Sequence, residues 1–146
     1  MIDPKRIMYD EGRRQALDLQ SRAPEMTGTE IIAEEINVPA WCPDKDYSGW
    51  SEGSPVPDEG QVWTLHQPHN ATDYPGRPST IRALWGLAHT TDPAKAKPWV
   101  APYGTSGMYM AGECYVDGDG VVHRCKQDNT AHDAAALPEA WEAVAV

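Results

Sequence analysis

The residues best suited to chemistry in this sequence are aromatic rings with polar side chains close by. The chain has six Trp and six Tyr but no Phe. Trp and Tyr join an apolar ring to a hydrogen-bonding group, which suits a surface that meets a polar ligand. A sugar is such a ligand, because its apolar face stacks on a ring while its hydroxyls need polar partners. The candidate ligand-binding residues are Tyr47, Trp50, Trp63, Gln67, His69, Asn70, Tyr74 and Tyr109.

The same kinds of ring could instead fill small cores. We expect this role for Trp41, Trp85, Trp99 and Trp141. For Trp50 and Trp63 both roles stay open, and strand geometry separates them. Trp63 and Leu65 share one face of an expected strand, and Val62 lies on the other. If Val62 points inward, Trp63 is exposed; if Trp63 points inward, Trp50 is the better ligand candidate.

Metal binding and catalysis find little support in the sequence. The histidines of His66-Gln67-Pro68-His69 lack the tight pairing that zinc sites show. The run Asp117-Gly118-Asp119-Gly120 hints at calcium, but an EF-hand register places Tyr115 and Lys126 at ligand positions. Gly-x-Ser-x-Gly, phosphate-loop and His-Glu-x-x-His motifs are absent. We therefore expect no metal, no cofactor and no enzymatic activity.

Charge and hydropathy exclude two classes of partner. Lys and Arg number 12 and Asp and Glu 22, which gives a net charge of −10. A nucleic-acid-binding protein needs a basic face for the phosphates, so this balance argues against one. No apolar run approaches the roughly 20 residues of a membrane span, so we expect no membrane insertion. The first 14 residues lack the apolar region of a secretory signal.

The cysteines indicate a reducing compartment during assembly. There are three of them, Cys42, Cys114 and Cys125, and no Cys-x-x-Cys motif. An odd count without a regular pattern is not a disulfide framework. A bridge between Cys114 and Cys125 across a hairpin stays open as an alternative.

Residues 1–38 contain no Trp and no Cys and are rich in charged residues, unlike the rest of the chain, and their pattern predicts a helical segment. Asp10 to Gln20 reads as one helix. Thr27 and Glu30 have capping-box spacing and predict a second helix, which Asn37-Val38-Pro39 ends. Helices this short are not stable alone, so they need the rest of the chain, a second copy or a larger assembly as partner.

An internal repeat indicates two small β modules, residues 39–88 and 98–146, joined by a connector at 89–97. Gly53 and Gly60 of the first module match Gly112 and Gly120 of the second. Each module predicts a three-stranded antiparallel sheet with its opening Trp on the first strand and a Gly-containing hairpin next. The fold class is therefore mainly β, with a helical N-terminal segment and two modules related by duplication.

The order of Trp, Tyr or Trp, Gly, Gly, Gln and a closing Trp resembles the small chitin-binding carbohydrate-binding modules of families five and twelve. It looks closer still to the module in small proteins that tailed bacteriophages encode near their tail-fibre genes. There an acidic helical segment ending in Pro-Ala-Trp precedes the module, as APEMTGTEIIAEEINVPAW does here. The resemblance covers residues 23–146. The second module departs from it, since His123 stands where the first has Trp63.

The resemblance implies a non-enzymatic component of a phage virion, made in the host cytoplasm, that binds host-surface polysaccharide. The N-terminal segment would contact other virion proteins and assemble the chain, most simply as a trimer by analogy with phage appendages. One alternative is a purely structural virion protein, such as a decoration, collar or tail component, that uses the modules for packing. Another is a secreted bacterial polysaccharide-binding module, which the absent signal sequence and unpaired cysteines disfavour.

Overall fold

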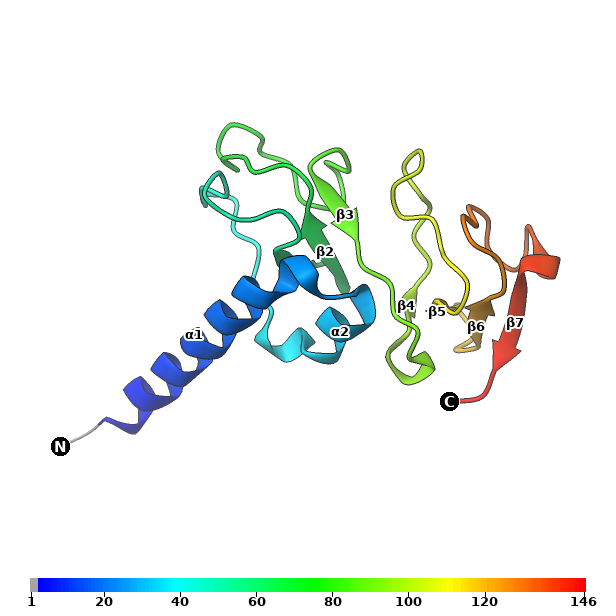
Figure 1. The fold of residues 1–146 in the computed structure, drawn as a ribbon, viewed down its shortest axis with the longest axis horizontal. Helices are drawn as coiled ribbons and strands as arrows, with labels where there is room; N and C mark the ends of the chain where they lie inside the picture. Colours follow the sequence, from blue (N-terminus) through cyan, green and yellow to red (C-terminus); the bar gives the residue numbers. More distant parts are fainter. Residues whose placement is uncertain (1–2) are drawn as a thin grey trace.

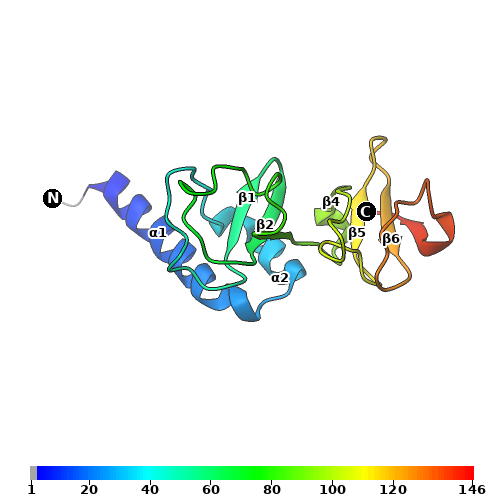
Figure 2. The same ribbon diagram turned by 90° about the horizontal axis from the view of Figure 1, so that it is seen from above.

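In sequence the chain forms two helices followed by two small sheets. The two sheets lie one after the other along the long axis, α2 lies beside the first sheet, and α1 extends away from it (Figures 1 and 2). The structure, a computed structural model, describes residues 3–146. The α-helices are α1 (Pro4–Arg22) and α2 (Gly28–Ala33), and 3-10 turns span Ala23–Glu25, Glu35–Asn37, Pro93–Lys95 and Pro138–Ala140. The strands are β1 (Pro55–Asp58), β2 (Gln61–Leu65), β3 (Trp85–Leu87), β4 (Lys97–Pro98), β5 (Cys114–Val116), β6 (Val122–Cys125) and β7 (Trp141–Val144).

The expectation of a helical N-terminal segment followed by two small sheets is confirmed. The first sheet has the order β1-β2-β3, and the second has the order β4-β5-β6-β7. All neighbouring strands are antiparallel except β4 and β5, which are parallel. The expected three-stranded antiparallel sheet is therefore wrong for the second module, whose sheet has four strands. Among residues 3–146, no helix combines the length and apolar character that a membrane crossing needs.

The opening Trp lies on the first strand in neither module, contrary to expectation, since β4 ends at Pro98, directly before Trp99. Trp41 lies in no strand, because Pro39 and Pro43 on either side of it lack the N–H groups that a ladder uses. The last strand of each sheet begins at the closing Trp, where Trp85 of β3 pairs with Leu65 and Trp141 of β7 pairs with Cys125.

The hairpin strand β2 separates two cores. Trp63 and Leu65 face a core with Tyr47, Val56 and Trp85. Val62 faces the opposite way, into a second core built from residues of both helices. That second core contains Leu19, Ala23, Ile31, Ile32 and Val38. The helical segment therefore finds part of its partner in the first module itself.

Helix α1 is longer than expected because it begins at Pro4. Asp3 caps it, accepting a hydrogen bond from the Lys5 amide at 3.0 Å, and proline is favoured at the first helical position. Of the helix, only Leu19 is buried, and its N-terminal half extends away from the sheets (Figure 1). Helix α2 has the expected capping box, since Thr27 and Glu30 cap each other.

Corresponding hydrogen bonds hold the two sheets. The Gly53 amide donates to the Leu65 carbonyl, and the Gly112 amide donates to the Cys125 carbonyl, both at 2.8 Å. Both glycines have positive φ, 89° and 94°, a conformation that favours glycine. In the second module the core consists of Tyr109, Tyr115, Cys125, Ala140 and Trp141. Cys125 and the other two cysteines are free thiols.

Candidate functional site

The position of Trp63 settles which tryptophan of the first module can meet a ligand. Trp63 is 1% exposed, and its indole N–H donates to the Asp58 carbonyl at 3.2 Å. It therefore fills the core with Leu65, and a sugar cannot stack on it in this conformation. Trp50 is only half-buried and becomes the better candidate.

Trp50 belongs to a line of four rings, Trp50, Tyr47, His69 and Tyr74, which we call the ring row. The Trp50 and Tyr47 rings meet edge to face at 4.7 Å between centroids, and Tyr47 lies 6.0 Å from His69. His69 meets Tyr74 edge to face at 5.8 Å. The two inner rings are buried and the outer ones reach solvent, with Tyr74 51% exposed. The ring row thus holds two aromatic platforms on a rigid base.

Polar groups from one loop flank the ring row. His69 is held by its Nδ1, 2.8 Å from the Gln67 carbonyl oxygen. Asn70 accepts hydrogen bonds from the amide and hydroxyl of Thr72 through its side-chain oxygen. Lys45 lies over the Trp50 ring, 4.9 Å from its centroid. Gln67 and Lys45 are exposed, and the Gln67 side-chain amide donates to the Ala83 carbonyl at 3.1 Å, which leaves its Oε1 to accept from a ligand.

A buried carboxylate anchors the long loop between β2 and β3 that carries Tyr74. The Asp58 side chain is fully buried. Its Oδ1 accepts from Arg77 Nε at 2.8 Å, and its Oδ2 accepts from the Ser79 hydroxyl at 3.0 Å. Arg77 also lies over the Trp41 ring, 5.5 Å from its centroid. Because hydrogen bonds to a buried charge are strong, this contact fixes the loop relative to the sheet.

Tyr109 lies apart from the other candidates, in the core of the second module. It is 1% exposed and stacks between His89 and Trp99, at 3.7 and 4.9 Å between centroids. Burial, the largest cause, raises the pKa of its hydroxyl. Its amide donates to the Thr130 carbonyl as the Tyr47 amide does to His69. Tyr109 therefore has the same place in the second module that Tyr47 has in the first.

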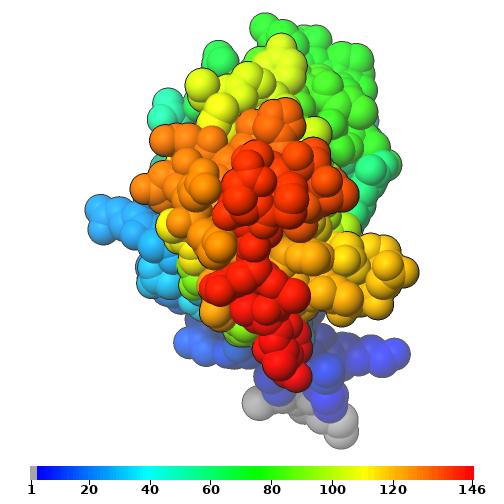
Figure 3. All heavy atoms as spheres, turned by 90° about the vertical axis from the view of Figure 1, so that its right-hand side faces the viewer, coloured from blue at the N-terminus to red at the C-terminus, as the bar shows by residue number. Residues whose placement is uncertain are grey.

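Sequence reasoning missed a groove on the second module, with a volume of about 600 Å³. Its size falls within the range of small-molecule sites. It lies beside the β5–β6 hairpin, whose turn projects from the end of the molecule that carries the second module (Figure 3). The side chains that line it are Pro98, Trp99, Tyr115, Val116, Asp117, His123, Asp133, Ala134 and Ala135. The one sequence signal for it is His123, which replaces the tryptophan of the first module.

An Asp–His pair forms one wall of this groove. His123 Nε2 lies 2.8 Å from Asp117 Oδ2, and the imidazole stacks on Tyr115 at 5.0 Å. The hydrogen bond from His123 lowers the pKa of the Asp117 carboxyl most, and the hydrogen bond from the Val121 amide lowers it further. Burial, with smaller effects of Asp133 and Asp117, raises the pKa of the Tyr115 hydroxyl. Asp117 and Asp133 thus both influence aromatic side chains of this groove electrostatically.

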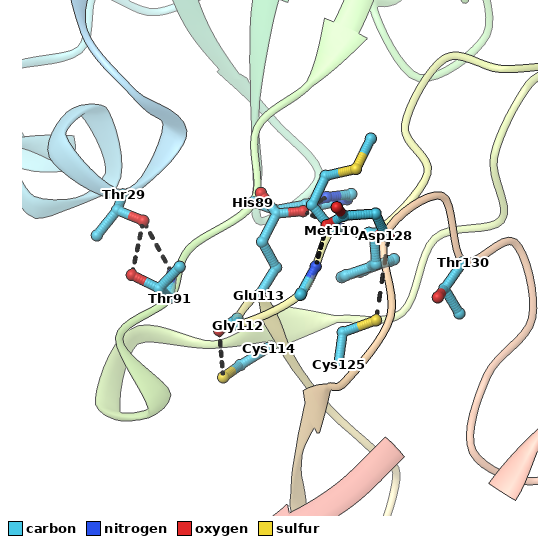
Figure 4. Close-up of polar contacts among 12 residues, drawn as sticks. Thr29, His89, Thr91, Met110, Gly112, Glu113, Cys114, Cys125, Asp128 and Thr130 are labelled. Atoms are coloured by element: carbon cyan, nitrogen blue, oxygen red, sulfur yellow. Dashed lines mark hydrogen bonds and ion pairs between the residues drawn. The ribbon is translucent and has the colours of Figure 1, made fainter. Parts of the chain in front are cut away.

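A cluster of polar contacts ties the helices to both modules (Figure 4). The Thr91 amide donates to Thr29 Oγ1 at 2.9 Å. His89 Nδ1 lies 3.2 Å from Glu113 Oε1, which also accepts from the Met110 amide at 2.7 Å. His89 is buried and stacks on Tyr109. The connector is therefore packed against its neighbours on both sides.

Comparison with known proteins identifies no family for this chain. No protein-family model matches it, and a search of curated proteins finds no relative. Within residues 3–146, no three His, Cys, Asp or Glu side chains come together in a way that could hold a metal ion. Function is therefore inferred from the ring row and the groove themselves.

Proposed function

We propose that this chain is a non-enzymatic virion protein of a tailed bacteriophage that attaches to host-surface polysaccharide through its first module. The chain would be made in the host cytoplasm and carried on the tail or particle surface. This proposal rests on the resemblance of the modules to chitin-binding modules and on the ring row.

The observation that carries the sugar-binding part is the exposure of Trp50 and Tyr74 at the two ends of the ring row. An exposed aromatic ring held on a rigid base loses little conformational entropy when a ligand stacks on it. Gln67 and Asn70 supply amide groups from the same loop, and His69 is buried between the rings as part of their base. Apolar faces beside such polar groups are what a sugar ring requires.

Binding to polysaccharide tests this proposal. The full chain is incubated with insoluble chitin and with a printed array of bacterial surface polysaccharides. We expect retention on at least one of these polymers, and loss of retention in Trp50→Ala and Tyr74→Ala. Tyr103→Ala is the matched control, because Tyr103 is equally exposed, at 59%, but lies in the second module. Retention that is unchanged in both ring-row variants would overturn the assignment of the site.

The alternative is a purely structural virion protein, and one observation favours it. Three of the candidate rings, Tyr47, Trp63 and Tyr109, are buried in cores, where they stabilise the modules and cannot touch a ligand. In this alternative the modules serve as packing units between partners. Absence of binding to every polysaccharide, together with assembly into particles, would favour it.

We also infer that the two modules arose by duplication. The matched hydrogen bonds of Gly53 and Gly112 support this inference, and so do the closing tryptophans at the same place in each sheet. The positive φ of Gly60 and Gly120 in the two hairpin turns is a further match. Independent origins would not readily reproduce all of these in the same order.

We propose further that α1 joins copies of the chain, as a trimer, or joins the chain to other virion proteins. Met8, Gly12 and Leu19 lie on one face of the helix by their spacing. Leu19 is buried on the first module, whereas Met8 on the same face is 75% exposed. One face of α1 is thus packed on the first module at its C-terminal end. At its N-terminal end the same face has no partner among residues 3–146.

A further inference from the structure

We propose that the groove of the second module binds an organic ammonium group, carried by an amino sugar or by a quaternary ammonium substituent of a surface polymer. The source of the ligand rests on the proposed function, but the chemistry of the groove does not. The inference gives the second module a ligand class of its own, different from the neutral sugar proposed for the ring row.

Three rings supply the surface that attracts a cation. Trp99 and Tyr115 meet edge to face at 5.2 Å between centroids, and His123 stacks on Tyr115. All three line the groove, and Trp99 and His123 are only partly buried. Aromatic faces attract ammonium groups through their quadrupole, and the attraction strengthens where water is excluded.

Two carboxylates give the groove a negative charge, and no Lys or Arg side chain among those that line it balances them. Asp117 uses Oδ1 to accept from the amides of Asp119 and Val121, and Oδ2 to accept from His123. Asp133 uses Oδ1 to accept from the Ala136 amide at 3.0 Å. The Oδ2 atom of Asp133 is left to meet a ligand cation directly.

The balance of donors and acceptors favours an ammonium group over a neutral sugar. Sugar hydroxyls both donate and accept, so they need donors as well as acceptors from the protein. A carboxylate only accepts, and His123 spends its Nε2 proton on Asp117, which leaves Nδ1 an acceptor in the neutral ring. The Tyr115 hydroxyl accepts from the Ala134 amide at 2.9 Å and still has its own O–H to donate. Because the two carboxylates and the imidazole Nδ1 add more acceptors than this donor offsets, the groove best matches a ligand group that donates hydrogen bonds and carries a positive charge.

Titration of the full chain with small ligands tests the proposal. Glucosamine, N-acetylglucosamine and choline chloride are added separately at pH 7, and amide chemical shifts of Tyr115, His123 and Ala134 are followed by NMR. We expect saturable shifts with glucosamine, choline or both, and at least about tenfold weaker binding of N-acetylglucosamine, because acetylation removes the charge. The first two ligands distinguish an amino sugar from a quaternary ammonium group.

Charge variants complete the test. Asp133→Asn should weaken binding of the ammonium ligand by about tenfold. Asp128→Asn is the matched control, because it removes the same charge from an exposed side chain of the same module outside the groove. Equal binding of glucosamine and N-acetylglucosamine, or no saturable shift with any ligand, would overturn the proposal. Because these readouts lie in the second module, they are independent of polysaccharide retention by the ring row.

Discussion

At the scale of single residues, Trp50 and Trp63 take opposite roles although they are identical in type and lie in the same module. Trp63 is buried in the first core and Trp50 reaches solvent at one end of the ring row. The alternation of β2 decides this, because Val62 on the other face is needed to pack against the helices. A strand with cores on both faces leaves no exposed position for Trp63.

Alanine substitution separates these two roles. Trp63→Ala should lower the free energy of unfolding by about 3–5 kcal/mol, since it removes a fully buried indole and leaves a cavity. Trp50→Ala should lower the free energy of unfolding clearly less, because the Trp50 side chain is only partly buried. Urea unfolding followed by circular dichroism measures both. Equal losses for the two variants would place Trp50 in the core as well.

The buried Asp58 predicts a second effect on stability. Asp58→Asn should destabilise the chain by about 2–3 kcal/mol, because an amide cannot accept from Arg77 and Ser79 as the carboxylate does. Glu59→Gln changes charge at the exposed neighbour and should stay within about 0.5 kcal/mol of wild type. Chemical denaturation of both variants gives the comparison, and equal stabilities would argue against Asp58 as the anchor of the loop.

The pKa of Asp117 predicts a pH dependence. His123 lowers the pKa of this carboxyl in the folded chain, so its contribution to stability is present above the unfolded value of about 3.9. That contribution is lost as the pH falls through the lower folded value. The stability difference between wild type and Asp117→Asn should therefore shrink from pH 7 to pH 2.5 in denaturant titrations. A difference that stays constant over this range would contradict the role of the carboxylate charge.

Sequence reasoning reached some of these residues and not others, for physical reasons. Strand alternation showed that Trp63 is either buried or exposed, depending on which face of β2 covers the core. Only the position of the helices decides between the two. The ring row could not be foreseen as a unit, because Tyr47 and His69 meet through the folding of a loop. Asp117 was interpreted as a turn residue, since its partner His123 lies across the hairpin, and Asp133 gave no signal at all.

At the scale of elements, the hairpins and caps were predictable because their signals are local. β2 is present with Trp63 and Leu65 on one face and Val62 on the other, and the Thr27 capping box forms as expected. The start of α1 was missed although Asp3 and Pro4 are standard signals for a helix start. The last strand of each sheet, β3 or β7, was missed because it forms by pairing with residues distant in the sequence.

The contact between α2 and the connector gives a prediction at this scale. A methyl group added at Gly28 would overlap the backbone carbonyl of His89, which cannot move without disturbing the junction. Gly28→Ala should therefore destabilise the chain by about 1–3 kcal/mol. Gly49→Ala is the control, because a methyl group there meets no atom within 4 Å. Thermal unfolding of both variants is the measurement, and matching melting temperatures would show that α2 is not held tightly.

At the scale of the whole molecule, the helical segment has two parts with different partners. Leu19, Ile31 and Ile32 belong to a core with Val62, so removing residues 1–36 would expose the first module. The N-terminal half of α1 makes no such core contact and carries Ile7, Met8 and Tyr9 at the surface. A truncation that tests assembly must therefore end before Leu19.

Removing residues 1–17 should leave a folded chain and abolish its assembly. Analytical ultracentrifugation of the full chain is expected to give a trimer, and the truncated chain a monomer with an unchanged circular dichroism spectrum in the β region. Met8→Lys in the full chain should weaken assembly in the same direction, because it places a charge on the exposed apolar face. A truncated chain that keeps the oligomeric state of the full one would exclude α1 as the joining element.

The central claim is that the exposed rings of the first module bind polysaccharide. The most direct measurement is equilibrium binding of the full chain to chitin and to arrayed bacterial surface polysaccharides, with wild type, Trp50→Ala and Tyr103→Ala compared at equal concentration. We predict that wild type and Tyr103→Ala bind the same polymer with equal affinity, and that Trp50→Ala, folded by circular dichroism, does not bind. Equal binding by all three proteins, or no binding by wild type to any polymer, would contradict the claim.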